Sequence, residues 1–306
     1  MKREITSILD EARRAPSVLN SQPWGFRVCG NTIEVYLEKN PELATIDTHG
    51  RLQLASCGTL IAHLKKSIRS KGWVAKTKYF PRFEEENLVA YVEVKGLNGG
   101  TKQSPSTPEE AEPETGTPDT LEVKQKQIAA IASREDIGLL IHDDGPDNKV
   151  QNYFKDNCGE KLNDENFRKN LNLFMRPDSA DTAVPFEDEA LLSDRFFESD
   201  DPVNIDGISW PDTFRNRYFV LVTGTDNRYE WTRAGEALGN IMLEVREWDA
   251  VGLMALPIIT DECCRKWLKD ELNIRETPQF VLKMQPVKPK EHIHKRPLKE
   301  MLKYGF

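Results

Sequence analysis

Two long, largely apolar segments constrain the fold of this chain more than any other feature of its sequence. Residues 51–71 carry apolar side chains at helical spacing on more than one face, which predicts a helix buried inside the molecule. A second helix is predicted from about Trp231 to Asp249, and a shift of 180 positions lays the two over each other without a gap. The expected helix stop Gly72 then falls on Gly252. The pattern indicates two related halves, packed around a pseudo-two-fold axis as the subunits of a dimer are.

Short strand-like runs accompany both long helices. In the first half we expect an N-terminal helix that ends at Pro16, and a hairpin that turns at Gly30-Asn31. The other strands of this half are WVAKTKYF and LVAYVEV. In the second half we expect a helix at LEVKQKQIAAIAS and strands at RYFVLVTG and QFVLKMQ. The sequence therefore predicts an α+β fold with sheet flanked by helices.

Residues 98–120 differ in composition from the rest of the chain. They contain four prolines, three glycines and a single apolar residue, Ala111. Such a stretch cannot bury enough surface to offset the entropy lost on ordering. We therefore predict a flexible linker between a first half, residues 1–97, and a second half, residues 121–306. A helix is also expected near residues 164–175, but residues 134–214 otherwise follow no clear pattern.

The overall charge and the apolar runs exclude several classes of protein. The net charge is −8, so nucleic acid and anionic membranes are not expected partners. The most apolar run, Val251 to Thr260, is about half of the roughly 20 residues that a spanning helix requires. The N-terminus has no apolar signal region, and an odd number of cysteines fits reduced thiols. We expect a cytoplasmic protein.

Familiar catalytic and metal-binding motifs are missing. The chain contains no GxSxG, HExxH, GxxxxGK[ST] or strand-linked GxGxxG motif. Its five histidines and five cysteines do not have metal-ligand spacing, and DDGPDN at 143–148 lacks the positions of a calcium loop. We therefore expect no metal site.

Three other stretches could carry chemistry. The loop APSVLNSQPW at 15–24 can present amides and hydroxyls to a polar ring edge, although a packed turn would look the same. Small residues within Arg233–Leu243 allow close approach by a second helix or a flat ligand. Basic residues in HKRPLKEML at 294–302 suit a phosphate, or form a solvated basic end.

Together these stretches resemble the nitroreductase family of FMN-dependent oxidoreductases. APSVLNSQPW is similar to that family's APSxxNxQPW loop, and HKRPLKEML to its closing basic segment. Arg233 to Leu253 is similar to its long central helix followed by a Gly-Leu turn. RLQLASCGTLIAHLKKSIRSKGW and TPQFVLKM resemble the Acg subgroup, in which one chain contains both halves of the usual dimer.

The resemblance implies a nitroreductase-like mixed sheet flanked by helices, with FMN in the cleft between the halves of a pseudo-dimer. It implies that the flavin carries the chemistry, without a catalytic side chain. The implied cofactor-binding residues are Pro16, Ser17, Asn20, Gln22, Gly252, Leu253, His294 and Arg296. Among these, Arg296 with His294 would hold the phosphate. The family's second phosphate motif corresponds here only to residues 133–136 (SRED), whose two acids would repel phosphate.

The resemblance also implies the reaction. We expect NAD(P)H to reduce FMN, and an electron-poor acceptor such as a nitroaromatic or a quinone to reoxidise it. The alternative is an Acg-like protein that sequesters FMN beneath a lid with little or no turnover, with residues 176–214 as the lid. A flavin-free interaction protein is a third alternative, and association of the fused chain into a homodimer stays open.

Overall fold

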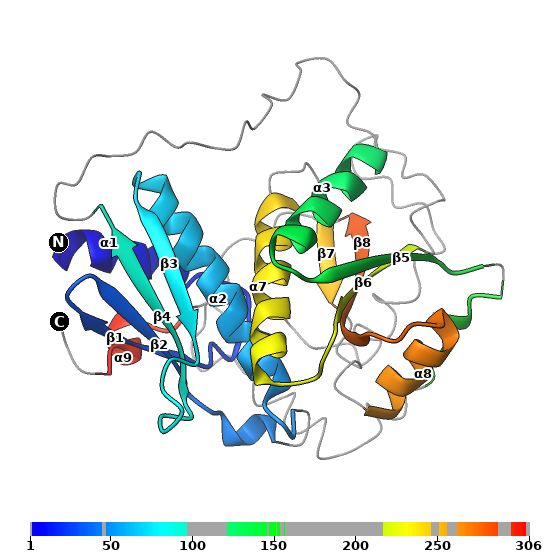
Figure 1. The fold of residues 1–306 in the computed structure, drawn as a ribbon, viewed down its shortest axis with the longest axis horizontal. Coiled ribbons are helices and arrows are strands. Elements are labelled where there is room, and N and C mark those ends of the chain that lie inside the picture. The colour runs from blue at the N-terminus through cyan, green and yellow to red at the C-terminus, as the bar shows by residue number, and fades with distance from the viewer. Residues whose placement is uncertain are drawn as a thin grey trace, which may run out of the picture.

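The fold is known from a computed structural model. It describes residues 2–44, 47–96, 121–145, 147–150, 152–153, 156, 217–245, 251–255, 262–286 and 295–303, with the backbone alone at 2, 19, 42, 121–122, 124, 245, 251–255 and 283–286. These residues form a mixed α+β structure with two separate antiparallel sheets of four strands each (Figure 1). No helix in the described ranges is long and apolar enough to cross a membrane.

The first sheet has the strand order β1-β2-β4-β3. Its strands are β1 (Trp24–Cys29), β2 (Thr32–Leu37), β3 (Val74–Tyr79) and β4 (Leu88–Lys95). Helix α1 (Lys2–Ala12) precedes β1, and α2 (Arg51–Ser70) connects β2 to β3. The predicted hairpin turn and helix stop are confirmed, because Gly30 and Gly72 have φ of 63° and 75°, values that favour glycine.

The second sheet repeats this order as β5-β6-β8-β7. Its strands are β5 (Gly138–Asp143), β6 (Arg217–Thr223), β7 (Val251–Ala255) and β8 (Thr277–Pro286). Helix α3 (Leu121–Arg134) precedes β5, α7 (Arg228–Val245) connects β6 to β7, and α8 (Glu262–Leu272) is added before β8. The register also shifts within the central strand pair of each sheet, after Val35 in one and after Leu221 in the other. Both halves therefore contain the order helix–strand–strand–helix–strand–strand, and the second half adds α8 and helical residues at 149–150 and 152–153 between β5 and β6.

Helices α2 and α7 pack side by side at the centre of the molecule (Figure 1). A Cβ atom on Gly235 would lie closer than 3.0 Å to the backbone of Ala55, and one on Gly239 would lie 2.8 Å from Cα of Thr59. The small residues of α7 therefore serve helix–helix packing, one of the two uses that the sequence allows. Residues 55 and 235, and residues 59 and 239, are also pairs related by the shift of 180 positions.

The hydrophobic core divides along the same lines. Buried side chains of α1, α2 and one face of the first sheet form one cluster, which includes Ile8, Val35 and Leu60. On the second sheet, α3 and α7 cover one face, while α8 covers the other through Cys264 and Leu268. Alternating residues of β6 point to these two faces, as the two-residue period of a strand requires.

The C-terminal segment returns to the first sheet. After α9 (Leu298–Met301), Leu302 forms a parallel bridge to Phe26 of β1, and the backbone N–H of Lys303 donates to the Phe26 carbonyl at 2.9 Å. Met301 is fully buried against the same sheet. The last described residues of the second half therefore lie beside β1 of the first half, and α9 lies near α1 and β1 in Figure 1.

One prediction about the second half is wrong, and others are not tested. Gly252 lies inside strand β7, paired with Gln285 of β8, and neither stops a helix nor starts a Gly-Leu turn. The physical reason is that an extended backbone pairing with β8 satisfies these peptide groups in a ladder. The linker at 98–120, the helix near 164–175 and residues 176–214 lie outside the described residues.

Candidate functional site

The loop between α1 and β1 has an unusual backbone at two positions. Asn20 and Gln22 have φ of 54° and 47°, in the left-handed region that residues other than glycine seldom adopt. Hydrogen bonds within the loop hold this shape. The Gln22 N–H donates to Oγ of Ser17 at 3.0 Å, and the Gln22 side-chain amide donates to the Asn20 carbonyl at 3.2 Å. Strain of this kind persists only where the surroundings enforce it, which is common at ligand sites.

Helix α2 fixes the same loop from below. Oγ of Ser56 accepts from the Val18 N–H at 3.0 Å, and the Thr59 hydroxyl donates to the Pro16 carbonyl at 2.6 Å. Two polar atoms of the loop have no hydrogen-bond partner within the described structure, although they are buried. These are Oγ of Ser21 and Nε1 of Trp24. The loop therefore keeps unused polar groups next to a rigid helix.

The C-terminal basic segment meets this loop directly. The Arg296 N–H donates to Oε1 of Gln22 at 2.9 Å, and the Lys295 ammonium donates to Oδ1 of Asn20 at 3.0 Å. Arg13, the residue after α1, donates to the Arg296 carbonyl at 2.9 Å. The structure thus brings together Ser17, Asn20, Gln22 and Arg296, four of the predicted site residues, from opposite ends of the sequence.

The Arg296 guanidinium is already engaged in this arrangement. Its Nη1 and Nη2 atoms both lie 3.1 Å from Oε2 of Glu38, and Nη1 also donates to the Gln22 carbonyl at 3.0 Å. The Glu38 carboxylate therefore neutralises the guanidinium charge of Arg296, which according to the resemblance would bind the phosphate. Its predicted helper His294 lies outside the described residues.

Lys295, which the sequence analysis did not single out, is in the opposite situation. Its ammonium donates to the Ala15 carbonyl and to Asn20, each at 3.0 Å, and no carboxylate of the described residues lies within 4.0 Å of it. Burial, with a smaller effect from the charge of Arg13, lowers the pKa of Lys295 to about 8. The ammonium is therefore a partly buried cation without a counter-ion in this part of the structure.

The charges around the loop do not balance. Among the residues that the structure describes, four cations lie here, Arg13, Lys295, Arg296 and Lys303, together with two carboxylates, Asp10 and Glu38. With Lys295 protonated, these six groups carry a net charge of +2, in a chain whose overall charge is −8. An excess of positive charge beside donors of a rigid loop suits a dianionic ligand.

Gly252 and Leu253 lie elsewhere in the fold. They are in β7 at the edge of the second sheet, where they pair with Gln285 and Met284 of β8. The hydrogen bonds that gather Ser17, Asn20, Gln22 and Arg296 do not include them. Their predicted role beside the flavin stays a prediction.

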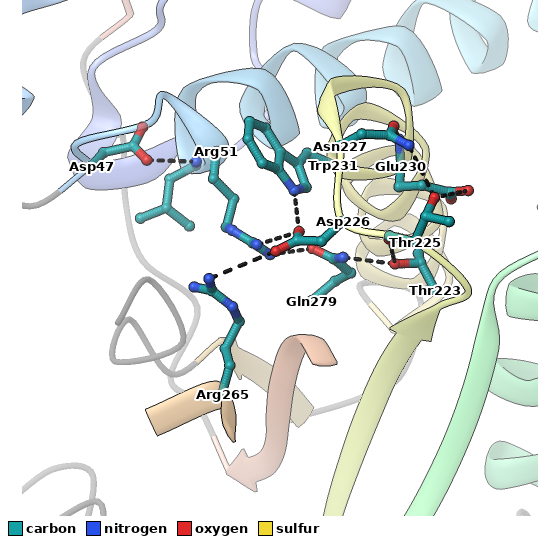
Figure 2. Close-up of polar contacts among 11 residues, drawn as sticks. Asp47, Arg51, Thr223, Thr225, Asp226, Asn227, Glu230, Trp231, Arg265 and Gln279 are labelled. Atoms are coloured by element: carbon teal, nitrogen blue, oxygen red, sulfur yellow. Dashed lines mark hydrogen bonds and ion pairs between the residues drawn. The ribbon is translucent and has the colours of Figure 1, made fainter. Parts of the chain in front are cut away.

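A second polar cluster joins the two halves (Figure 2). Arg51, the first residue of α2, donates to Gln279 of β8 and to the carboxylate of Asp226, which precedes α7. Oδ1 of Asp226 also accepts from Nε1 of Trp231 at 2.5 Å, and its Oδ2 lies 3.7 Å from Arg265 of α8. Figure 2 shows both arginines pointing toward this single carboxylate.

The two arginines of this cluster repel each other. Their side chains are only 6% and 10% exposed. Burial, and next the charge of Arg265, lowers the pKa of Arg51 to about 10, although Asp226 opposes this shift. Burial alone would raise the pKa of Asp226, but the Trp231 hydrogen bond and the two arginines lower it. The sequence offered one signal for this cluster, the charged residue Arg51 at the start of the largely apolar segment 51–71.

A third cluster of charged side chains accounts for the acidic residue Glu135 in the segment 133–136, where the resemblance would place a phosphate motif. Glu236 of α7 is fully buried and forms ion pairs with Lys65 of α2 and with Arg233. Arg233 also pairs with Glu135 at 2.7 Å, and Glu135 accepts from Asn240 at 3.0 Å. Glu135 is therefore a packing partner of α7, in a turn of three residues between α3 and β5.

Comparison with known proteins finds partial relatives. A Mycobacterium tuberculosis protein named "Putative NAD(P)H nitroreductase Rv3131" is 34% identical over 93 residues, which is 30% of this chain and 27% of that protein. The protein named "Putative NAD(P)H nitroreductase acg" from the same organism is 35% identical over 77 residues, which is 25% of this chain and 23% of that protein. "Uncharacterized protein Rv3127" is 31% identical over 86 residues, or 27% and 25% of the two chains.

These matches confirm the resemblance to nitroreductases and to the Acg subgroup. Each match spans only about a quarter of the relative's own length. No family model matches the chain.

Proposed function

We propose that this chain is an FMN-binding, NAD(P)H-dependent oxidoreductase of the nitroreductase type, acting on nitroaromatic or quinone-like acceptors. One observation carries the proposal: the loop that resembles APSxxNxQPW meets the C-terminal basic segment at a junction with a net charge of +2. The names of the partial relatives support the same class of reaction.

The residues at this junction fit FMN. The phosphate of the cofactor carries close to two negative charges at neutral pH, which matches the excess charge of the junction. Oγ of Ser21 and Nε1 of Trp24 are buried without a hydrogen-bond partner among the described residues, and a bound water would satisfy such groups. When bound, FMN supplies the hydride transfer, and the protein positions the ring and excludes competing reactions. Ser17, Asn20 and Gln22 contribute by holding the strained loop in one shape.

We further propose that the two halves form a pseudo-dimer. Both sheets have the same strand order and each half has the same sequence of elements. In an isologous interface, residues near the two-fold axis contact their own copies. The close contacts of Ala55 with Gly235 and of Thr59 with Gly239 follow this rule under the shift of 180 positions. The return of Leu302 to β1 also supports an intertwined pair of halves.

The test is visible absorbance of the purified protein under anaerobic conditions, before and after addition of NADPH or NADH. Flavin bands that bleach on addition support the proposal. Flavin bands that persist would favour the sequestering alternative, and absence of bands after incubation with FMN would refute both. An Asn20→Ala variant should lose flavin, because Asn20 links the loop to Lys295.

A further inference from the structure

The two neighbouring cations of the C-terminal segment differ in what they can offer a ligand. The Arg296 guanidinium is bound through two nitrogen atoms to Glu38 and through one to the Gln22 carbonyl. To bind a phosphate, the guanidinium would have to break its ion pair with Glu38, or the phosphate would have to bind next to this negatively charged carboxylate. Either costs free energy, since a carboxylate beside a phosphate repels it.

Lys295 carries no such cost. An ammonium has three N–H donors, and two of them are used, on the Ala15 carbonyl and on Asn20. The third has no acceptor among the described residues. Both acceptors are neutral, so the positive charge of Lys295 has no carboxylate partner among the described residues, and the residue is only partly buried, so a ligand can reach it.

We propose that Lys295, and not Arg296, is the residue through which this chain recognises a phosphate monoester. Arg296 is then a positioning residue, which fixes Gln22 and the strained loop through Glu38. Identification of the ligand as FMN rests on the proposed function, but the anion site itself does not.

Recognition by Lys295 has a pH signature. Among the described residues, the charged groups of the segments packed around it are Asp10 of α1, Arg13 after α1, Glu38 after β2, and Arg296 and Lys303 from its own segment. The ammonium loses its proton above about pH 8. A phosphate monoester becomes a dianion above about pH 6. Affinity should therefore be highest between about pH 6 and pH 8 and fall at higher pH.

The experiment compares FMN with riboflavin, which has the same ring but no phosphate, in wild type and four variants. In Lys295→Met the affinity for FMN should fall about 10- to 100-fold, the value of one charge-assisted hydrogen bond, while riboflavin binding is unchanged. Lys295→Arg should restore FMN binding and remove the fall in affinity above pH 8, because arginine stays charged. Lys78→Met is the matched control, since Lys78 is an exposed lysine of β3, the edge strand at the far side of the first sheet from β1. It should change the FMN-to-riboflavin ratio less than about threefold.

The variant Arg296→Met tests whether Lys295 or Arg296 recognises the phosphate. We expect lower thermal stability with an unchanged FMN-to-riboflavin ratio. If this variant loses the preference for FMN, and Lys295→Met keeps it, the proposal is overturned.

A second measurement does not depend on flavin. Inorganic phosphate should raise the melting temperature of the wild-type protein, and this shift should vanish in Lys295→Met and persist in Lys78→Met. Equal shifts in wild type and Lys295→Met, or none in wild type, would overturn the anion site. If phosphate raises the melting temperature only when Lys295 is present, but the protein binds neither FMN nor riboflavin, the anion site is supported and the proposed function is refuted.

Discussion

The cluster of Arg51, Asp226 and Arg265 gives the sharpest stability prediction. Asp226→Asn removes one charge but preserves the shape of the side chain, and an amide oxygen can still accept from Trp231. The change leaves the two arginines without their shared carboxylate, although their side chains are 6% and 10% exposed. Because Arg51 begins α2 and Arg265 belongs to α8, the loss falls on the contact between the halves.

The expected cost follows from the burial of the three groups. Removal of one partner from a buried ion pair costs about 3–5 kcal/mol, because the other charge is left uncompensated. The Asp226 side chain is 33% exposed, so water screens part of the interaction. We therefore expect the low end, about 3 kcal/mol in the free energy of unfolding. For a chain of this length that corresponds to a fall of about 5–10 °C in melting temperature.

A double-mutant cycle measured by thermal and urea unfolding tests the origin of this cost. If repulsion between the arginines contributes, Asp226→Asn should cost about 1–2 kcal/mol less in an Arg265→Leu background than in wild type. Glu230→Gln is the control. It removes a carboxylate in the first turn of α7 that accepts a hydrogen bond from Thr225, and it should lower the free energy of unfolding by less than about 0.5 kcal/mol. Equal costs of Asp226→Asn in both backgrounds, or a cost no larger than that of Glu230→Gln, would refute the reasoning.

Four further predictions follow from the same structure. The folded-state pKa of Asp226 lies below its ordinary value of 3.8, so the stability it contributes is complete above about pH 4 and is lost as the pH falls through the lowered pKa. The difference in unfolding free energy between wild type and Asp226→Asn, measured by urea unfolding, should therefore close in acid. Gly235→Ala should cost about 3 kcal/mol or more by thermal unfolding, because its Cβ meets the backbone of Ala55, whereas Gly224→Ala, with open space around it, is the neutral control. Glu236→Gln should cost about 3 kcal/mol in chemical denaturation by leaving Lys65 and Arg233 without their buried carboxylate, and a loss below 1 kcal/mol would contradict that role. The pKa of Lys295 is lowered from 10.5 to about 8, so between these values the unfolded chain binds more protons; wild type should gain stability relative to Lys295→Met as the pH rises from 8 to 10, and a constant gap would mean an ordinary pKa.

The sequence by itself determined the local elements and their order. Helical periodicity located α1, α2, α3 and α7, and strand-like runs bounded by turn residues located six strands, because these signals depend on neighbours within a few positions. The sequence analysis missed β5, β7 and α8. The loop at 15–24 was also found this way, since two prolines and small polar residues mark it. The shift of 180 positions between the long helices predicted their likeness, and the two sheets have the same strand order. At Gly252 the same kind of argument was wrong, because pairing with β8 decides the backbone there.

Only the tertiary structure decided which charges meet. In the sequence Lys295 and Arg296 are equivalent members of one basic run, and the basic-Arg-Pro pattern favours Arg296. Glu38, which distinguishes them, is more than 250 positions away. The Arg51, Asp226 and Arg265 cluster likewise joins residues from three distant elements. Local periodicity carries no information on such pairs, because an ion pair depends on a distance of a few ångströms in space and not on separation along the chain.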